Sequence, residues 1–201
     1  MVKMSAKDES TEAAAGLNML PRADGLQEQL WVLQAQQGDH EAFQSLVNQY
    51  DRRLLYFVMR FANRQEQALD VLQEVWVTVF RRLRKLRSPA AFRVWLYQIA
   101  HDKVVSLIRQ NVREEAIHQQ LLEERGNNAD EPDPISDNAE LVHRALGELT
   151  AEHREVLVLR FLEDLSLDEI AQLLRCSLGT VKSRLHYAKQ AIKITIERQH
   201  E

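Results

Sequence analysis

The sequence predicts an all-α protein made of two small helical domains joined by a flexible acidic linker. Gly (6) and Pro (4) are scarce among the 201 residues, and hydrophobic residues make up 45%, a composition that favours packed helices. Apolar residues recur at spacings of three and four on both sides of one stretch that is poor in them. That stretch, 114–140, is the predicted linker.

The charge along the chain is segregated and supports the same division. Residues 26–113 carry 13 Lys and Arg against 8 Asp and Glu, a net charge of +5, and residues 114–140 carry 1 against 9, a net charge of −8. Residues 141–201 are neutral, with 9 of each. The linker, with Pro132 and Pro134 among its acids, cannot bury enough apolar surface to offset its ordering entropy. The net charge of −4 therefore conceals a basic domain that could bind nucleic acid.

Several other classes of protein are disfavoured. The single cysteine, Cys176, excludes an internal disulfide, and the sequence contains no clustered metal ligands and no motif of a catalytic site. We therefore expect a protein that is not an enzyme and needs neither metal nor cofactor. The most apolar run, 54–62, is too short to cross a bilayer and contains Arg60, so no membrane insertion is expected. Residues 1–25 lack the apolar core of an export signal, so we expect a disordered tail and a cytoplasmic location.

Two short helices joined by a tight turn are predicted in 166–192. Ser166 followed three residues later by Glu169 is the pattern of a capping box, which starts a helix. Ser177 can cap the second helix, and a supporting helix is predicted upstream, in 149–165. The apolar residues of the second helix recur at spacings of four, three and four, which places them on one buried stripe: Val181, Leu185, Ala188 and Ile192.

The second helix of this pair is left with a polar and basic outward face. A helix-turn-helix presents such a helix to the major groove of DNA, where short polar side chains allow close approach and Lys and Arg neutralise phosphates. The candidate DNA-binding residues are Ser177, Thr180, Lys182, Ser183, Arg184 and Lys189. Because helix pairs are common, the spacing alone leaves a plain hairpin with a solvated basic face equally open.

The N-terminal half predicts a helical bundle. Gly38 and Asp39 mark the end of one helix and the start of the next, and 68–86 forms a further amphipathic helix. The segment 88–110 begins with a Ser-Pro turn and continues as an aromatic and basic helix.

The motifs of both halves resemble those of sigma-70 family sigma factors, particularly the extracytoplasmic-function (ECF) group. "LTAEHREVLVLRFLEDLSLDEIAQLLRCSLGTVKSRLHYAKQAI" resembles region 4, and "GDHEAF", "DVLQEVW" and "FRVWLYQIA" resemble region 2, in the family's order. The resemblance implies a region 2-like domain at 26–113, a linker at 114–140 and a region 4-like helix-turn-helix domain at 141–198. The C-terminal block is also similar to LuxR-type regulators, which lack the N-terminal block, so a LuxR-like DNA-binding regulator is the alternative.

The resemblance implies an alternative sigma factor that binds core RNA polymerase and promoter DNA, with an anti-sigma factor as a further partner. The outward residues of the C-terminal helix would then read the −35 element. The residues matched to −10 recognition and DNA melting are Arg87, Arg93, Trp95, His101, Lys103 and Arg109. The residues matched to binding of the polymerase largest subunit are Asp70, Gln73, Glu74 and Val77.

The sequence departs from the family pattern at a few positions. His101 and Asp102 stand where Arg-Asn is common, Ser106 where Asp is frequent, and Leu69 where an acid is frequent. An acid near DNA weakens the attraction of phosphates, so Asp102 is expected to face away from the strand or to change promoter preference. The acidic linker is expected either to occupy polymerase channels that otherwise hold nucleic acid or to act as a solvated spacer.

Overall fold

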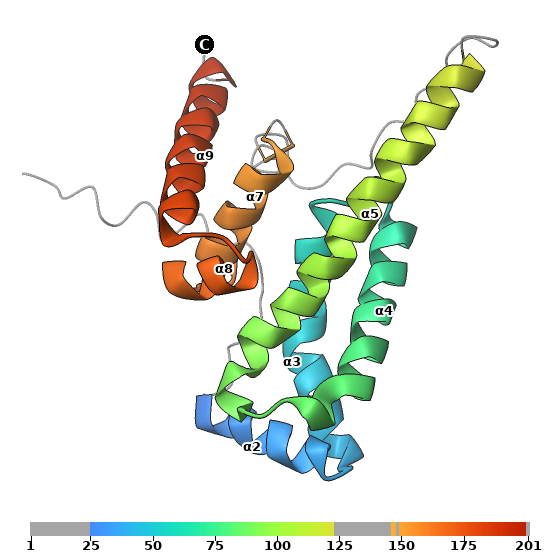
Figure 1. The fold of residues 1–201 in the computed structure, drawn as a ribbon, viewed down its shortest axis with the longest axis vertical. Coiled ribbons are helices and arrows are strands. Elements are labelled where there is room, and N and C mark those ends of the chain that lie inside the picture. Colours follow the sequence, from blue (N-terminus) through green and yellow to red (C-terminus); the bar gives the residue numbers. More distant parts are fainter. Residues whose placement is uncertain (1–24, 123–145, 148, 200–201) are drawn as a thin grey trace, which may run out of the picture.

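The computed structural model describes residues 25–122, 146–147 and 149–199, and every regular element in these ranges is a helix, as the sequence predicts (Figure 1). The helices fall into two groups, the N-terminal bundle (α2 to α5) and the C-terminal helices (α7 to α9 with η3). The predicted tail, except Gly25, and most of the predicted linker lie outside the described residues. The start of that linker, 114–122, is a helical continuation of α5.

The N-terminal bundle consists of three long helices that pack side by side, with a shorter helix across one end (Figure 1). Its elements are α2 (Gly25–Gln36), α3 (His40–Met59), α4 (Gln65–Arg82), η1 (Leu83–Lys85), η2 (Pro89–Ala91) and α5 (Phe92–Leu122). Helix α2 packs on α3, and α4 packs on both α3 and α5. The two short 3₁₀ turns carry the chain from α4 into α5.

The predicted break at Gly38 and Asp39 is confirmed in the structure. Gly38 has φ 101°, a left-handed conformation that favours glycine, and it separates α2 from α3. The side chain of Asp39 then caps α3, because its Oδ1 accepts the backbone N–H groups of Glu41 at 2.9 Å and Ala42 at 3.1 Å.

The core of the bundle is aliphatic and aromatic. The rings of Tyr50 and Phe57 on α3 meet those of Phe92 and Tyr97 on α5 edge to face, with centroid distances of 5.8 Å for Tyr50–Phe92 and for Phe57–Tyr97. All four side chains are buried. This packing orients α5 on α3 and thereby fixes which side of α5 faces outward.

The C-terminal helices form a compact helix-turn-helix with a supporting helix. The elements are α7 (Ala151–Leu157), a π-helical turn η3 (Val158–Leu162), α8 (Leu167–Leu173) and α9 (Leu178–Gln199). The predicted capping box is confirmed: the Ser166 hydroxyl accepts the Glu169 N–H, and the Glu169 carboxylate accepts the Ser166 N–H. The turn between α8 and α9 passes through Arg175, which has φ 53°.

Within the described residues, no helix combines the length and apolar character that crossing a membrane requires.

Candidate nucleic-acid interface

Helix α9 presents the polar face that the sequence predicts. Ser177 caps the helix, since its Oγ accepts the Thr180 N–H at 3.0 Å and lies 2.8 Å from the Thr180 hydroxyl. Val181 and Ala188 are fully buried against α7 and α8, so the opposite side of α9 faces outward. Lys182 and Ser183 are exposed there, and Arg184 is half-buried.

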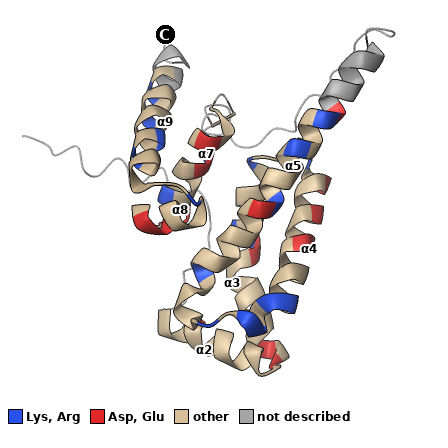
Figure 2. Ribbon diagram, viewed as in Figure 1, with Lys and Arg blue, Asp and Glu red and all other residues tan. Residues whose placement is uncertain are grey.

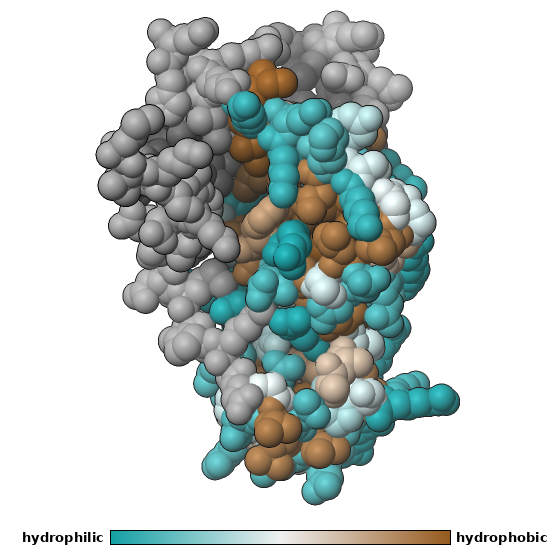
Figure 3. Space-filling model, turned by 90° about the vertical axis from the view of Figure 1, so that its left-hand side faces the viewer, coloured by the Kyte–Doolittle hydropathy of each residue, from teal (hydrophilic) through white to brown (hydrophobic). Residues whose placement is uncertain are grey.

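Apolar groups are interspersed with this polar surface. The Lys189 ammonium lies 5.1 Å from the ring centroid of Phe161, and both Phe161 and Tyr187 are exposed. Figure 3 views the molecule from the side on which α9 lies and shows hydrophobic areas broken up by hydrophilic side chains. The C-terminal helices thus present a mixed surface, with the cations of α9 at its polar part.

The six residues matched to −10 recognition do not form one continuous exposed surface. Arg87 precedes α5, and the other five follow along α5 from its first turn to Arg109. Arg87 and Arg109 are exposed, whereas the remaining four are only partly exposed: Arg93, Trp95, His101 and Lys103. Trp95 packs on the bundle core beside Phe92, with ring centroids 6.1 Å apart.

Arg93 and His101 are in contact with carboxylates of the C-terminal helices. Nη2 of Arg93 lies 3.0 Å from Oε1 of Glu169, and Nδ1 of His101 lies 2.5 Å from Oε1 of Glu155. Helix α5 and helix α8 are packed against each other at this contact. Two of the predicted promoter contacts therefore already have acidic partners in this arrangement.

These contacts shift the pKa of the groups that make them. Burial alone would lower the pKa of His101, but the hydrogen bond and the charge of Glu155, with a smaller effect of Asp102, outweigh it and raise the pKa. Burial alone would raise the pKa of Glu169, but its hydrogen bonds with Ser166 and Arg93 outweigh burial and lower the pKa. Both shifts favour the charged forms that the contacts need.

Asp102, the unexpected acid, faces the C-terminal helices. Its Oδ2 lies 3.4 Å from Nη2 of Arg175, the residue at the turn between α8 and α9. Both side chains are more than half exposed, so the electrostatic attraction is weakened by solvent.

The four residues matched to polymerase binding form one exposed stripe along α4. Asp70, Gln73, Glu74 and Val77 lie three and four residues apart and are all exposed. Glu74 also forms an ion pair with Lys103 of α5, with 2.6 Å between Oε2 and Nζ. The structure thus brings one predicted polymerase contact and one predicted promoter contact together.

The sequence reasoning missed a basic cluster where α4 ends. Arg81, Arg82, Arg84, Lys85 and Arg87 are all exposed and lie close to α2, as Figure 2 shows for the end of α4. We call these five residues the basic run. The signal was present in the letters "RRLRKLR", which place five cations within seven positions, but only Arg87 was assigned to DNA.

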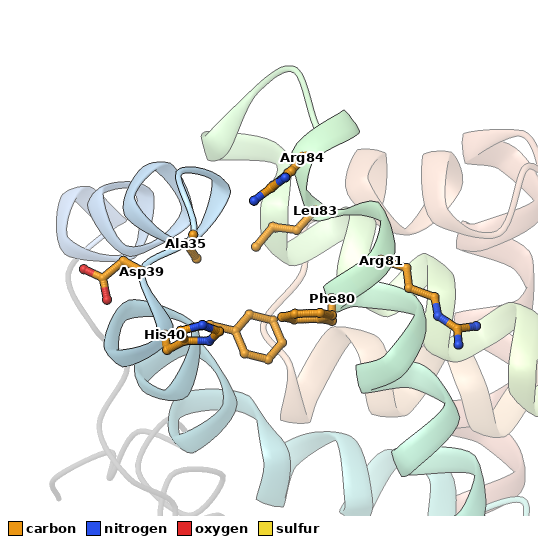
Figure 4. Close-up of a pocket in the computed structure, with 9 residues that line it drawn as sticks. Ala35, Asp39, His40, Phe80, Arg81, Leu83 and Arg84 are labelled. Atoms are coloured by element: carbon orange, nitrogen blue, oxygen red, sulfur yellow. The ribbon is translucent and has the colours of Figure 1, made fainter.

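A pocket of about 350 Å³ lies beside this basic run (Figure 4). Phe43 and Phe80, whose ring centroids are 5.3 Å apart, form its apolar floor, and the Arg84 side chain extends over it. Phe80 is 58% exposed and lies three residues after Val77, so it prolongs the apolar part of the α4 stripe. No group of His, Cys, Asp and Glu side chains within the described ranges is arranged to hold a metal ion.

Comparison with known families accounts for both groups of helices. Residues 46–114 match the family model described as Sigma-70 region 2, and residues 139–192 match that described as Sigma-70, region 4. The RNA polymerase sigma-H factor of Pseudomonas aeruginosa is 32% identical over 177 residues, which cover 83% of this chain and 92% of that protein. The chain belongs to the sigma-70 family.

Other relatives point to the ECF group of that family. The ECF RNA polymerase sigma-E factor of Escherichia coli (strain K12) is 32% identical over 181 residues, covering 85% of this chain and 94% of that protein. The sigma-E factor of Haemophilus influenzae is 30% identical over 186 residues, covering 87% and 98%. The LuxR alternative finds no support in these comparisons.

Solved structures agree on the fold. CnrH, solved in complex with the cytosolic domain of CnrY, superimposes with a TM-score of 0.65 at 24% identity, covering 86% of this chain and 98% of that chain. The sigma factor RpoE from Bartonella quintana, solved with the anti-sigma factor NepR, gives a TM-score of 0.65 at 20% identity and covers 77% and 96%. At these identities the likeness concerns the fold alone.

Proposed function

We propose that this chain is an alternative sigma factor, a non-catalytic subunit that directs core RNA polymerase to promoters and promotes DNA melting. The observation that carries the proposal is the presence of region 2 and region 4 in one chain and in the family's order. A second support is the exposed polar face of α9, which suits the major groove.

The proposal assigns a separate surface to each task. Helix α9, capped by Ser177, reads the −35 element with Thr180, Lys182, Ser183, Arg184 and Lys189. The cations of α5 and the basic run hold the opened strand near the −10 element, because an unpaired strand needs cations along its backbone. The α4 stripe binds the polymerase.

The proposal also includes the regulation and location of the protein. Membership of the ECF group supports an anti-sigma factor as a partner, and the two fold neighbours named above were each solved with such a protein or a similar domain. A subunit of RNA polymerase works where transcription takes place, so we propose a cytoplasmic location. The predicted boundaries 26–113, 114–140 and 141–198 are part of the same proposal.

Capture of core RNA polymerase tests the proposal. The tagged full-length chain is incubated with purified bacterial core polymerase, and the recovered complex is used for run-off transcription on fragmented source DNA. Stable capture with new, discrete start sites is the expected result. Absence of capture, together with sequence-specific duplex binding by the chain alone, would overturn the proposal in favour of a LuxR-like regulator.

A matched pair of variants links capture to the α4 stripe. Gln73→Lys adds one positive charge to the stripe, and Asn48→Lys adds the same charge to an exposed position on α3. Gln73→Lys should reduce capture at least fivefold, whereas Asn48→Lys should leave it unchanged. Equal effects of the two variants would contradict the assignment of the α4 stripe.

A further inference from the structure

The contact between the N-terminal bundle and the C-terminal helices is built from opposite charges. Three carboxylates of the C-terminal helices face cationic side chains of the bundle: Glu155 faces His101, Glu163 faces Arg53, and Glu169 faces Arg93. Asp102 and Arg175 form a fourth pair with the signs exchanged. Every pair joins residues at least 54 positions apart, so the contact is tertiary.

Glu163 is the most deeply buried of these acids. It follows η3, its residue is 1% exposed, and its Oε2 lies 3.8 Å from Nη1 of Arg53 on α3. Burial, and then the adjacent Glu163 carboxylate, raise the pKa of the Tyr97 hydroxyl well above its usual value. A buried carboxylate is tolerated only beside compensating groups, and those near Glu163 belong to α3 and α5. Glu163 is thus specific to the packed arrangement of the two groups.

Apolar packing and a backbone contact continue the same interface. Leu54, Phe57 and Ile99 of the bundle belong to one contiguous cluster of buried residues with Leu159 and Ile170 of the C-terminal helices. Arg154 of α7 donates a hydrogen bond to the backbone carbonyl of Arg60, just beyond α3. The interface therefore has an apolar interior with a rim of ion pairs, the organisation of a specific contact.

The interface covers one predicted DNA surface and leaves the other open. Arg93 and His101 are matched to the −10 element, and here they hold carboxylates in place of phosphates. Lys182 and Ser183, on the polar face of α9, are exposed. A single strand could not reach Arg93 or His101 without displacing Glu169 and Glu155.

We propose that the free chain adopts a closed state in which the C-terminal helices mask the strand-binding cations of α5, with Glu163 as the buried anchor, so that −10 binding requires the two groups to separate. The masking of promoter contacts rests on the proposed sigma-factor function, whereas the closed contact itself does not. Polymerase, by holding the two groups apart, would expose Arg93 and His101 together.

Energy transfer between two dyes tests the closed contact in the full-length chain without polymerase. The native Cys176 is replaced by Ser, and dyes are attached at Gln65→Cys, at the start of α4, and Gln172→Cys, on α8, both exposed positions. Glu169→Arg, which places two arginines against each other, should lower the ratio of closed to open molecules at least tenfold. Asp168→Arg, the same change at the exposed neighbouring residue, should not.

A charge exchange protects the test against misfolding. Arg93→Glu alone should open the chain by repulsion from Glu169, and the double variant Arg93→Glu with Glu169→Arg should close it again. Far-UV circular dichroism verifies that each variant remains helical. If neither single variant changes energy transfer, or if the double variant stays as open as the single ones, the closed contact is wrong.

A binding measurement tests the masking. A fluorescein-labelled single-stranded (dT)15 is titrated with each variant, and its anisotropy is recorded. Glu163→Lys and Glu169→Arg should open the chain and bind the strand at least fivefold more tightly than the parent, and Asp168→Arg should match the parent much more closely. Opening without tighter strand binding would overturn the masking. Closure combined with failure to capture polymerase would instead count against the sigma-factor function alone.

Discussion

Lys103 on α5 and Glu74 on α4 form an ion pair, with 2.6 Å between Nζ and Oε2. Glu74 is matched to polymerase binding and Lys103 to the −10 element, so each predicted interface contains one member of the pair. Both side chains are partly exposed, at 33% for Lys103 and 62% for Glu74, and such a pair contributes at most about 1 kcal/mol. Polymerase that binds Glu74 would release Lys103 at little cost.

Two substitutions separate the roles of this pair. Glu74→Gln should weaken capture of core polymerase by about three- to tenfold, because it removes a charged contact. Lys103→Gln should leave capture unchanged and reduce promoter opening, measured by permanganate reactivity of unpaired thymines. If Lys103→Gln weakens capture as much as Glu74→Gln, Lys103 is part of the polymerase contact.

The closed state should depend on pH through His101. Its pKa is raised from the ordinary 6.5 by Glu155, with Asp102 adding to the shift and Arg175 opposing it. Protonated His101 therefore stabilises closure fully below pH 6.5, and this contribution is lost as pH rises through the raised pKa. Energy transfer between the dyes at positions 65 and 172 should fall over that range.

His101→Gln provides the control for the pH effect. The amide can still donate a hydrogen bond to Glu155, but it does not titrate, so the fall in energy transfer above pH 6.5 should disappear. A fall of the same size in His101→Gln would assign the pH dependence to another group.

Arg184 on α9 should carry part of −35 recognition. Arg184→Ala should reduce run-off transcription at least tenfold, because a specific Arg contact to a base is worth about 1–3 kcal/mol, while capture of polymerase stays intact. Gln190→Ala, at an exposed position of the same helix outside the predicted site, should have no effect. Equal loss of capture and transcription in Arg184→Ala would contradict this division of tasks.

The basic run should contribute to the salt dependence of strand binding. Each phosphate contact to a single strand adds about 0.7 to the slope of log affinity against log salt concentration. Replacing Arg81 and Arg84 together by Gln should therefore lower that slope by about 1.4, as measured by anisotropy in the Glu169→Arg background. Arg64→Gln, at the opposite end of α4, should leave the slope unchanged, and an unaltered slope in the double variant would exclude the basic run from the strand site.

The capping box should stabilise the helix-turn-helix. Ser166→Ala removes the acceptor for the Glu169 N–H and should lower the free energy of unfolding by about 1 kcal/mol, seen as a reduced Tm. Glu169→Gln keeps an acceptor for the Ser166 N–H and should cost less. A larger loss in Glu169→Gln would indicate that the contact with Arg93 stabilises the chain more than the cap.

Local features of the fold could be predicted because neighbouring residues determine them. The Asp39 cap, the Ser166–Glu169 box and the Ser177 cap all form, and each depends on residues two or three positions apart. The buried stripe of α9 follows from helical spacing in the same way, with Val181 and Ala188 fully buried.

The contact between the two groups of helices could not be predicted in this way. Glu155 and Glu163 have the sequence surroundings of ordinary solvated acids, and Arg93 and His101 were matched to DNA. Whether a charge meets water, a phosphate or a distant carboxylate depends on tertiary packing, which the spacing of residues along one helix does not contain. The site residues themselves stay predictions that the experiments above address.

The pairing of Arg93 with Glu169 also bears on how such a chain can evolve. Arg93 would serve a carboxylate in one state and a phosphate in the other, and a lysine replacement would lack the planar fork of the guanidinium. Glu169 is held by its helix cap as well as by Arg93. Neither residue can drift alone without affecting two tasks, so we expect their replacements to be inherited together among descendants of this chain.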